Sequence, residues 1–173
     1  MRIILGSKSA RRKELMELLG FDFIVEAADT DEDVPNYDNS VDYVRQVTLR
    51  KGLSFKNKYP DDLVICADTI VCLDDQILGK PKDIDEARKM MLLLSGNRHI
   101  VLTGVFLHYK TYSKVFVERT EVDIAHLELP EIEAYIKTNE PYDKAGGYAI
   151  QGYFAKYIKG IKGDYYNVMG LPL

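Results

Sequence analysis

The 173-residue sequence has no tryptophan, only two cysteines and no excess of basic residues. With neither a CxxC pair nor a Cys/His cluster, it offers no disulfide framework and no structural zinc site. Cys66 and Cys72 lie in one apolar stretch, so we expect two reduced, buried thiols. Lys and Arg total 23 against 27 for Asp and Glu, a net charge of −4. Because duplex binders usually carry a basic excess, we expect no nucleic-acid partner.

Long hydrophobic runs are also missing. The apolar opening, residues 1–6, is too short for a signal peptide or a membrane span, so we expect no membrane partner and a cytoplasmic location. Hydrophobic residues make up 46% and charged residues 29%, which is typical of a globular protein with a core. The length and the lack of a linker favour a single domain over residues 1–173, built of two lobes that share one core.

Helical and strand patterns alternate along the chain, which predicts an α/β fold. Ser40 is the expected N-cap of a long second helix. Gly20 is expected to end the first helix in a left-handed conformation. Strands are predicted near residues 3–5, 21–25, 63–67, 70–73, 76–78, 99–109, 113–124 and 153–158, and helices begin near residues 10, 40, 83 and 130.

The strand, turn and helix over residues 5–12 form the first candidate site. Free N–H groups and the macrodipole attract anions to a helix N-terminus, yet Arg11 and Arg12 occupy the first turn, where cations oppose the dipole. A phosphate held by the backbone, by the hydroxyls of Ser7 and Ser9 and by guanidinium groups would explain this arrangement. A solvated basic turn is the alternative. The spacing of a Walker A loop is absent.

Asp68 is the second candidate, because it interrupts an apolar run from residue 63 to residue 73. An ionised carboxylate in such a strand is costly unless it is paired, hydrogen-bonded or bound to a metal. Glu32 and Lys80 would complete a set of groups suited to Mg²⁺ and phosphate. A carboxylate that simply ends the strand is the other interpretation.

The third candidate is the glycine-rich stretch at residues 143–152. Glycine lets a ligand approach the backbone, and the Gln151 amide offers a donor and an acceptor that can match a pyrimidine edge. An ordinary glycine loop explains this segment equally well when it is taken alone. The three histidines have no motif partner and are interpreted as structural.

Taken together, these segments resemble one family along nearly the whole chain. The sequence is similar to Maf (septum-formation-inhibitor-like) proteins, which are nucleoside triphosphate pyrophosphatases. The matching segments are LGSKSARR (5–12), DE (31–32), Lys51, ADTIV (67–71), LGKP (78–81), LSG (94–96), TGV (103–105), EP (140–141), DKAG (143–146), IQG (150–152) and NVMGLP (167–172).

The resemblance implies an α/β fold of the inosine triphosphatase type, with an elongated mixed sheet, flanking helices and two lobes around a central cleft. It also implies hydrolysis of a nucleoside triphosphate to the monophosphate and pyrophosphate, with a divalent metal such as Mg²⁺, Mn²⁺ or Co²⁺. Asp68 matches the proton acceptor of the family and, with Glu32, the metal site. The other matching polar residues of the cleft are Ser7, Arg12, Lys51 and Lys80.

Three further positions separate the branches of the family. Arg11, Thr69 and Gln151 match the branch that acts on dTTP and UTP. The resemblance therefore implies a dTTP/UTP pyrophosphatase that removes unwanted or modified nucleotides and binds a small-molecule nucleotide, with a homodimer as a further expectation. Two alternatives remain open: a pyrophosphatase that prefers 7-methyl-GTP or another modified purine nucleotide, and a nucleotide-binding regulator of cell division without turnover. Gly52 departs from the family, in which alanine is usual.

Overall fold

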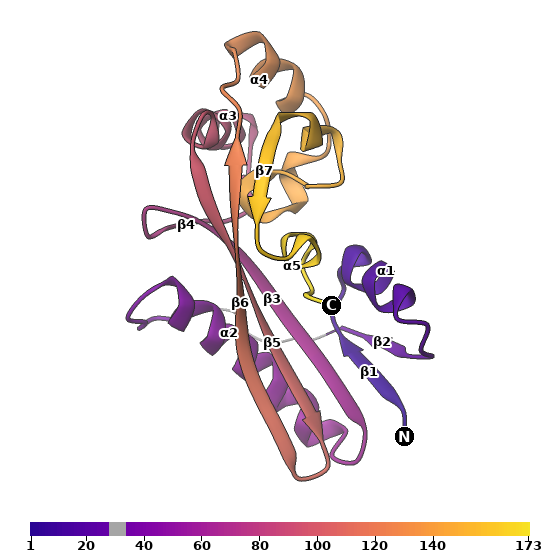
Figure 1. The fold of residues 1–173 in the computed structure, drawn as a ribbon. Helices are drawn as coiled ribbons and strands as arrows, with labels where there is room; N and C mark the ends of the chain where they lie inside the picture. The colour runs from indigo at the N-terminus through magenta and orange to yellow at the C-terminus, as the bar shows by residue number, and fades with distance from the viewer. Residues whose placement is uncertain (28–33) are drawn as a thin grey trace. The chain divides into compact units, whose positions relative to one another are not determined.

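The computed structural model describes residues 1–27 and 34–173. Its sheet has seven strands in the order β2-β1-β3-β5-β6-β7, with β4 paired to β3 (Figure 1). The pairings of β1 with β2 and with β3 are parallel, whereas β4 on β3 and β7 on β6 are antiparallel. The sheet is therefore mixed and carries helices along it, which confirms the predicted α/β class.

The elements follow the predicted alternation closely. The strands are β1 (Ile3–Gly6), β2 (Ile24–Glu26), β3 (Leu63–Leu73), β4 (Gln76–Leu78), β5 (Arg98–Tyr109), β6 (Tyr112–Ile124) and β7 (Ile158–Lys162). The α-helices are α1 (Ala10–Leu18), α2 (Ser40–Lys58), α3 (Ile84–Leu94), α4 (Leu129–Ile136) and α5 (Tyr165–Met169). Short 3₁₀ helices are η1 (Pro141–Asp143), η2 (Ala145–Gly147) and η3 (Tyr153–Tyr157).

Two compact units make up the chain. Unit 1 comprises Met1–Thr69, Thr103–Glu118 and Gly170–Leu173. Unit 2 comprises Ile70–Leu102 and Arg119–Met169. Strands β3, β5 and β6 each contribute residues to both units. The predicted single domain with one shared core stays a prediction.

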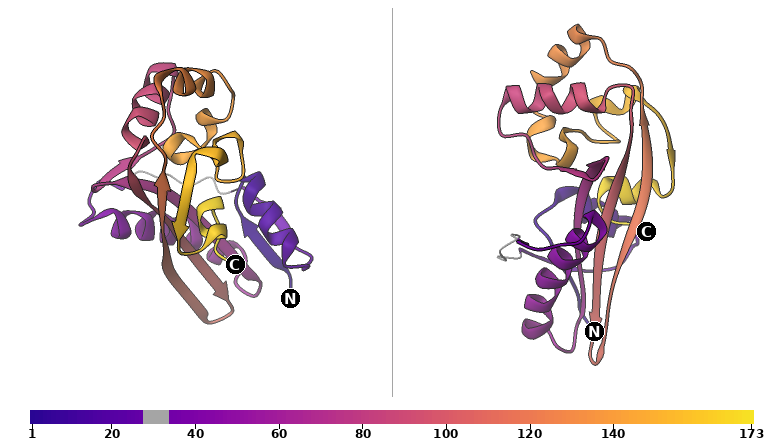
Figure 2. Two further views of the ribbon diagram at one scale, coloured as in Figure 1. Left: turned by 45° about the horizontal axis from the view of Figure 1, so that its top comes forward. Right: turned by 90° about the vertical axis from the view of Figure 1, so that its left-hand side faces the viewer.

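In unit 1, helix α2 packs on the strands through a small apolar cluster. Phe55 of α2 lies with Ile4, Val64, Cys66 and Phe106, and both views of Figure 2 show α2 alongside the long strands. A Cβ atom on Gly52 would overlap the Phe106 ring, so glycine at this position lets helix and strand approach closely. This contact gives a physical reason for the departure from alanine.

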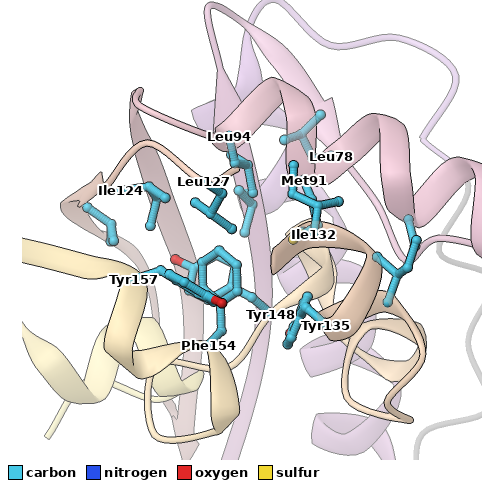
Figure 3. Close-up of a cluster of buried hydrophobic side chains, with 14 of the residues drawn as sticks. Leu78, Met91, Leu94, Ile124, Leu127, Ile132, Tyr135, Tyr148, Phe154 and Tyr157 are labelled. Atoms are coloured by element: carbon cyan, nitrogen blue, oxygen red, sulfur yellow. The ribbon is translucent and has the colours of Figure 1, made fainter. Parts of the chain in front are cut away.

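Unit 2 holds a larger core under α3 and α4. Met91 and Leu94 of α3, Ile132 of α4 and the rings of Tyr148 and Phe154 are buried together (Figure 3). Gly146 has φ of 71°, and a Cβ atom there would lie 2.7 Å from the Val71 side chain. Only glycine satisfies both the left-handed backbone and this close approach.

Most predicted elements are confirmed to within a few residues, but β2 begins only at Ile24 and helix α5 was not predicted. Two further predictions are wrong. The N-cap of α2 is Asn39, whose side chain accepts from the Asp42 N–H, so Ser40 is the first helical residue. Residues 153–157 form η3 and not a strand, because the Glu140 carboxylate accepts hydrogen bonds from the N–H groups of Tyr153 and Phe154. The last strand, β7, begins only at Ile158.

The two cysteines have the state expected from the sequence. Cys66 and Cys72 are free and buried, and burial raises the pKa of the Cys66 thiol to about 12.

Within the described ranges, no helix has both the length and the apolar character needed to cross a membrane. His99 and His108 are buried and hydrogen-bonded, in agreement with structural roles.

Unit 2 should lose stability in mild acid because of His99. Its Nε2 atom lies 2.7 Å from the Tyr148 hydroxyl, and burial lowers the pKa of the imidazole from 6.5 to about 4. Between these two values the unfolded chain binds a proton that the folded chain does not, so stability falls as the pH decreases through this window. The slope is at most about 1.4 kcal/mol per pH unit.

Urea unfolding at about pH 7.5 and about pH 5 measures this loss. His99→Gln keeps a polar partner for Tyr148 but does not titrate, so it should lose less stability between the two pH values than the wild type. An identical pH dependence in both proteins would contradict the assignment.

Candidate active site

The turn between β1 and α1 is built to receive an anion. The Ser9 hydroxyl accepts from the Arg12 N–H and caps α1, and the nearby Ser7 hydroxyl accepts from the Ser9 N–H at 3.2 Å. The first turn of α1 contains no acidic residue. The Ser7 side chain is buried, and its hydroxyl helps to hold the backbone of the turn in place. These contacts describe the turn at which a phosphate is predicted to bind, and the phosphate site itself stays a prediction.

The Arg12 side chain folds back over this turn and is held at three points. Its Nε donates to the Gly170 carbonyl at 2.7 Å, one terminal nitrogen donates to the Thr69 hydroxyl at 3.0 Å, and the other donates to the Ser7 hydroxyl at 3.3 Å. These three acceptors are uncharged, so they orient the guanidinium without themselves neutralising it. An oriented cation at a helix N-terminus is suited to bind a phosphate.

Lys51 and Asp68 form an ion pair in the same unit. The Lys51 Nζ atom of α2 lies 2.6 Å from Asp68 Oδ2 of β3, and the two side chains are only 9% and 16% exposed. Removing two charges from water costs several kcal/mol per ion, which their attraction does not always offset. A pair at this depth is therefore weak support for stability, and its presence favours a chemical role.

A divalent metal at Asp68 would be held through Oδ1, because the Oδ2 atom is buried and lies against Lys51 Nζ. Mg²⁺ is commonly held by one or two carboxylates together with phosphate oxygens and water. The residues of the two described ranges contain no group of three or more His, Cys, Asp or Glu side chains arranged for a metal. Glu32, the second predicted ligand, lies outside these ranges.

The remaining predicted residues divide between the units. Arg11 is partly buried on α1, and Thr69 ends the unit 1 part of β3. Lys80 and Gln151 belong to unit 2, where both are exposed. The Gly146 N–H donates to the Gly79 carbonyl at 3.1 Å, which ties the glycine-rich loop to the turn that carries Lys80. Unit 1 thus gathers Ser7, Arg12, Lys51, Asp68 and Thr69.

Two further groups support the unit 1 site and were not predicted as site residues. The Thr103 hydroxyl lies 2.9 Å from the Thr69 hydroxyl, and the Gly170 carbonyl accepts from Arg12. Thr103 is fully buried, and Gly170 adopts φ of 125°. Both lie in motifs of the family resemblance, but their contacts depend on the sheet and on the path of the C-terminal segment, which local sequence patterns do not predict.

Solved structures share this fold. A nucleoside-triphosphatase (dITP/XTP pyrophosphatase) from Mycobacterium abscessus superposes with a TM-score of 0.50 at 15% identity, covering 73% of this chain and 76% of that one. The Ham1 protein of Staphylococcus aureus gives a TM-score of 0.51 at 14% identity, covering 72% of each chain. The protein therefore has the α/β fold of the Ham1 class.

Sequence comparison narrows this class to one family. The Maf-like protein profile matches residues 2–173, so the chain belongs to the Maf family. A dTTP/UTP pyrophosphatase of Acholeplasma laidlawii is 46% identical over 172 residues, which cover 99% of this chain and 90% of the relative. A dTTP/UTP pyrophosphatase of Bacillus cytotoxicus shows the same identity and coverage.

Removal of the Thr103 hydroxyl should loosen the support of Arg12. Thr103→Val keeps the shape of the side chain but removes its contact with Thr69, so we expect the free energy of unfolding to fall by about 1 kcal/mol. Thr103→Ser retains the hydroxyl and should lose less. Urea denaturation measures both values, and equal stabilities for wild type and Thr103→Val would contradict the contact.

Proposed function

We propose that this protein is a nucleoside triphosphate pyrophosphatase that hydrolyses dTTP and UTP to the monophosphate and pyrophosphate. The observation that carries the proposal is the buried Lys51–Asp68 pair in the same unit as the oriented Arg12 guanidinium. A carboxylate for water activation and fixed cations for phosphate are what this reaction needs. The proposed substrates, dTTP and UTP, are taken from the names of the two relatives.

The triphosphate is proposed to bind at the N-terminus of α1. Ser7, the backbone of the turn and the Arg12 guanidinium supply donors to phosphate oxygens. Lys51 supplies a positive charge from α2, and a contribution from Lys80, which belongs to unit 2, stays a prediction. These cations stabilise the negative charge that develops on pyrophosphate as it leaves.

Asp68 is proposed as the group that orients and deprotonates the water attacking the α-phosphorus. Lys51 fixes one carboxylate oxygen, Oδ2, and the other oxygen is proposed to accept the proton of the water. A divalent cation held by Asp68 and Glu32, with Mg²⁺, Mn²⁺ or Co²⁺ as candidates, would supply charge neutralisation on the phosphates. Metal dependence is part of the proposal.

Base selection is proposed for Arg11, Thr69 and Gln151. The exposed Gln151 amide can donate to and accept from the edge of a pyrimidine, which presents both kinds of group. The Thr69 hydroxyl accepts a hydrogen bond from Arg12, so a residue proposed for base selection also contacts a residue proposed to bind phosphate. The proposed nucleotide substrate is a small molecule, and the net charge of −4 bears only on duplex nucleic acid.

A cytoplasmic location and a homodimer complete the proposal. Both cysteines are free and buried, as expected in a reducing compartment, where nucleoside triphosphates are also found. The homodimer stays a prediction that the oligomeric state in solution tests. A dissociation into monomers at working concentrations would contradict it.

The proposed function is tested by pyrophosphate release from a nucleotide panel with Mg²⁺, Mn²⁺ and Co²⁺. We expect release from dTTP and UTP, dependence on the metal, and at least about a thousandfold loss of turnover in Asp68→Asn. Because Asp68→Asn removes the negative charge beside Lys51, it should also lower the free energy of unfolding, so turnover is compared in samples that circular dichroism shows to be folded.

Other outcomes favour other functions. Preference for 7-methyl-GTP would indicate a pyrophosphatase for modified purine nucleotides. Tight binding of dTTP without pyrophosphate release, with metal present, would indicate a regulator without turnover. Near-normal turnover in Asp68→Asn would contradict the role of this carboxylate.

A further inference from the structure

One carboxylate in unit 2 joins the two ends of the loop that carries Gln151. Glu140 precedes this loop, and its Oε2 atom accepts from the Tyr153 N–H at 2.7 Å. Its Oε1 atom accepts from the Phe154 N–H at 3.2 Å. Both N–H groups lie in the first turn of η3, where free backbone donors and the helix dipole favour a negative charge. Glu140 thereby fixes the backbone directly after Gln151.

Tyr135 connects the same carboxylate to the middle of the loop. Its hydroxyl lies 3.0 Å from Glu140 Oε1 and 2.9 Å from the Gly147 carbonyl. The ring is fully buried. Burial, together with the neighbouring carboxylate, raises the pKa of the phenol, so it stays protonated and donates. The start, middle and end of the loop therefore meet at one pair of side chains.

Gly152 adds a steric reason for this arrangement. Its φ of −96° is accessible to any residue, yet a Cβ atom would overlap the Glu140 carboxylate. Glycine is thus required by the close approach of the acid and not by the backbone angle. Residues 148–150 before it are buried, whereas the Gln151 side chain is exposed. The loop presents one amide to solvent from a backbone anchored on both sides.

We propose that Glu140 is a positioning residue for base selection, which acts by holding the backbone around Gln151 so that the amide meets the pyrimidine edge in one orientation. This inference rests on the proposed function. A carboxylate suits the task because it only accepts hydrogen bonds and can satisfy two backbone donors at once. A glutamine at residue 140 would place its own NH₂ group against one of these backbone N–H groups, and two donors cannot form a hydrogen bond with each other.

The test is a double-mutant cycle with Glu140→Gln, Gln151→Ala and the double variant, assayed with dTTP. Glu140→Gln should raise KM for dTTP about tenfold with a smaller change in kcat, because a binding contact is lost in both ground and transition states. The inhibition constant of inorganic tripolyphosphate, which has no base, should stay within about twofold of the wild type. In the Gln151→Ala background the same substitution should have no further effect on KM.

Glu128→Gln is the matched control, because Glu128 caps the backbone of α4 in the same unit but not the loop. It should leave KM for dTTP unchanged. Gly152→Ala is a second variant that displaces the carboxylate by a different route, and it should reproduce the rise in KM even if Glu140→Gln fails to fold.

The outcomes separate the inference from the proposed function. Wild-type release of pyrophosphate from dTTP with additive effects of Glu140→Gln and Gln151→Ala would overturn the positioning role and leave the function intact. Parallel losses for dTTP and tripolyphosphate binding would also overturn it, because they indicate general damage. An inactive wild type would overturn both.

Discussion

The ion pair between Lys51 and Asp68 is the physical constraint around which the proposed site of unit 1 is arranged. It places a charged group of α2 beside the central strand β3, and the two side chains are only 9% and 16% exposed. Neither charge could be left there alone, because an unpaired buried charge costs several kcal/mol. Two glycines let the neighbouring elements approach closely: Gly6 of β1 lies against Cys66 and Phe55, and Gly52 of α2 lies against Phe106 of β5.

On the side of the site that is proposed to bind phosphate, several neutral oxygens orient Arg12. Arg12 is oriented by Ser7, Thr69 and the Gly170 carbonyl, and Thr103 supports Thr69 from β5. The guanidinium is thus held by several segments that are distant in sequence but belong to one unit. Such preorganisation stabilises developing charge without reorganisation during the reaction.

Much of this protein is predictable from its sequence, because its local signals agree with its fold. Helices α1 and α3 begin close to the predicted residues 10 and 83, and Asp68 stands out in the sequence as an isolated carboxylate in an apolar strand. Predictions from local sequence patterns were wrong where a side chain distant in sequence determines the local backbone conformation. Residues 153–157 have strand-like composition, but the Glu140 carboxylate binds their backbone and favours a helical turn. Thr103 and the Gly170 carbonyl act through contacts across the sheet, which no local pattern contains.

The central claim is that the Lys51–Asp68 pair is retained for chemistry and not for stability. The free energy of unfolding of the double variant Lys51→Met/Asp68→Leu tests this most directly, because it replaces the pair with apolar side chains of similar size. We expect stability equal to that of the wild type or up to about 4 kcal/mol higher, in a protein without pyrophosphatase turnover. A loss of several kcal/mol, or retained turnover, would contradict the claim.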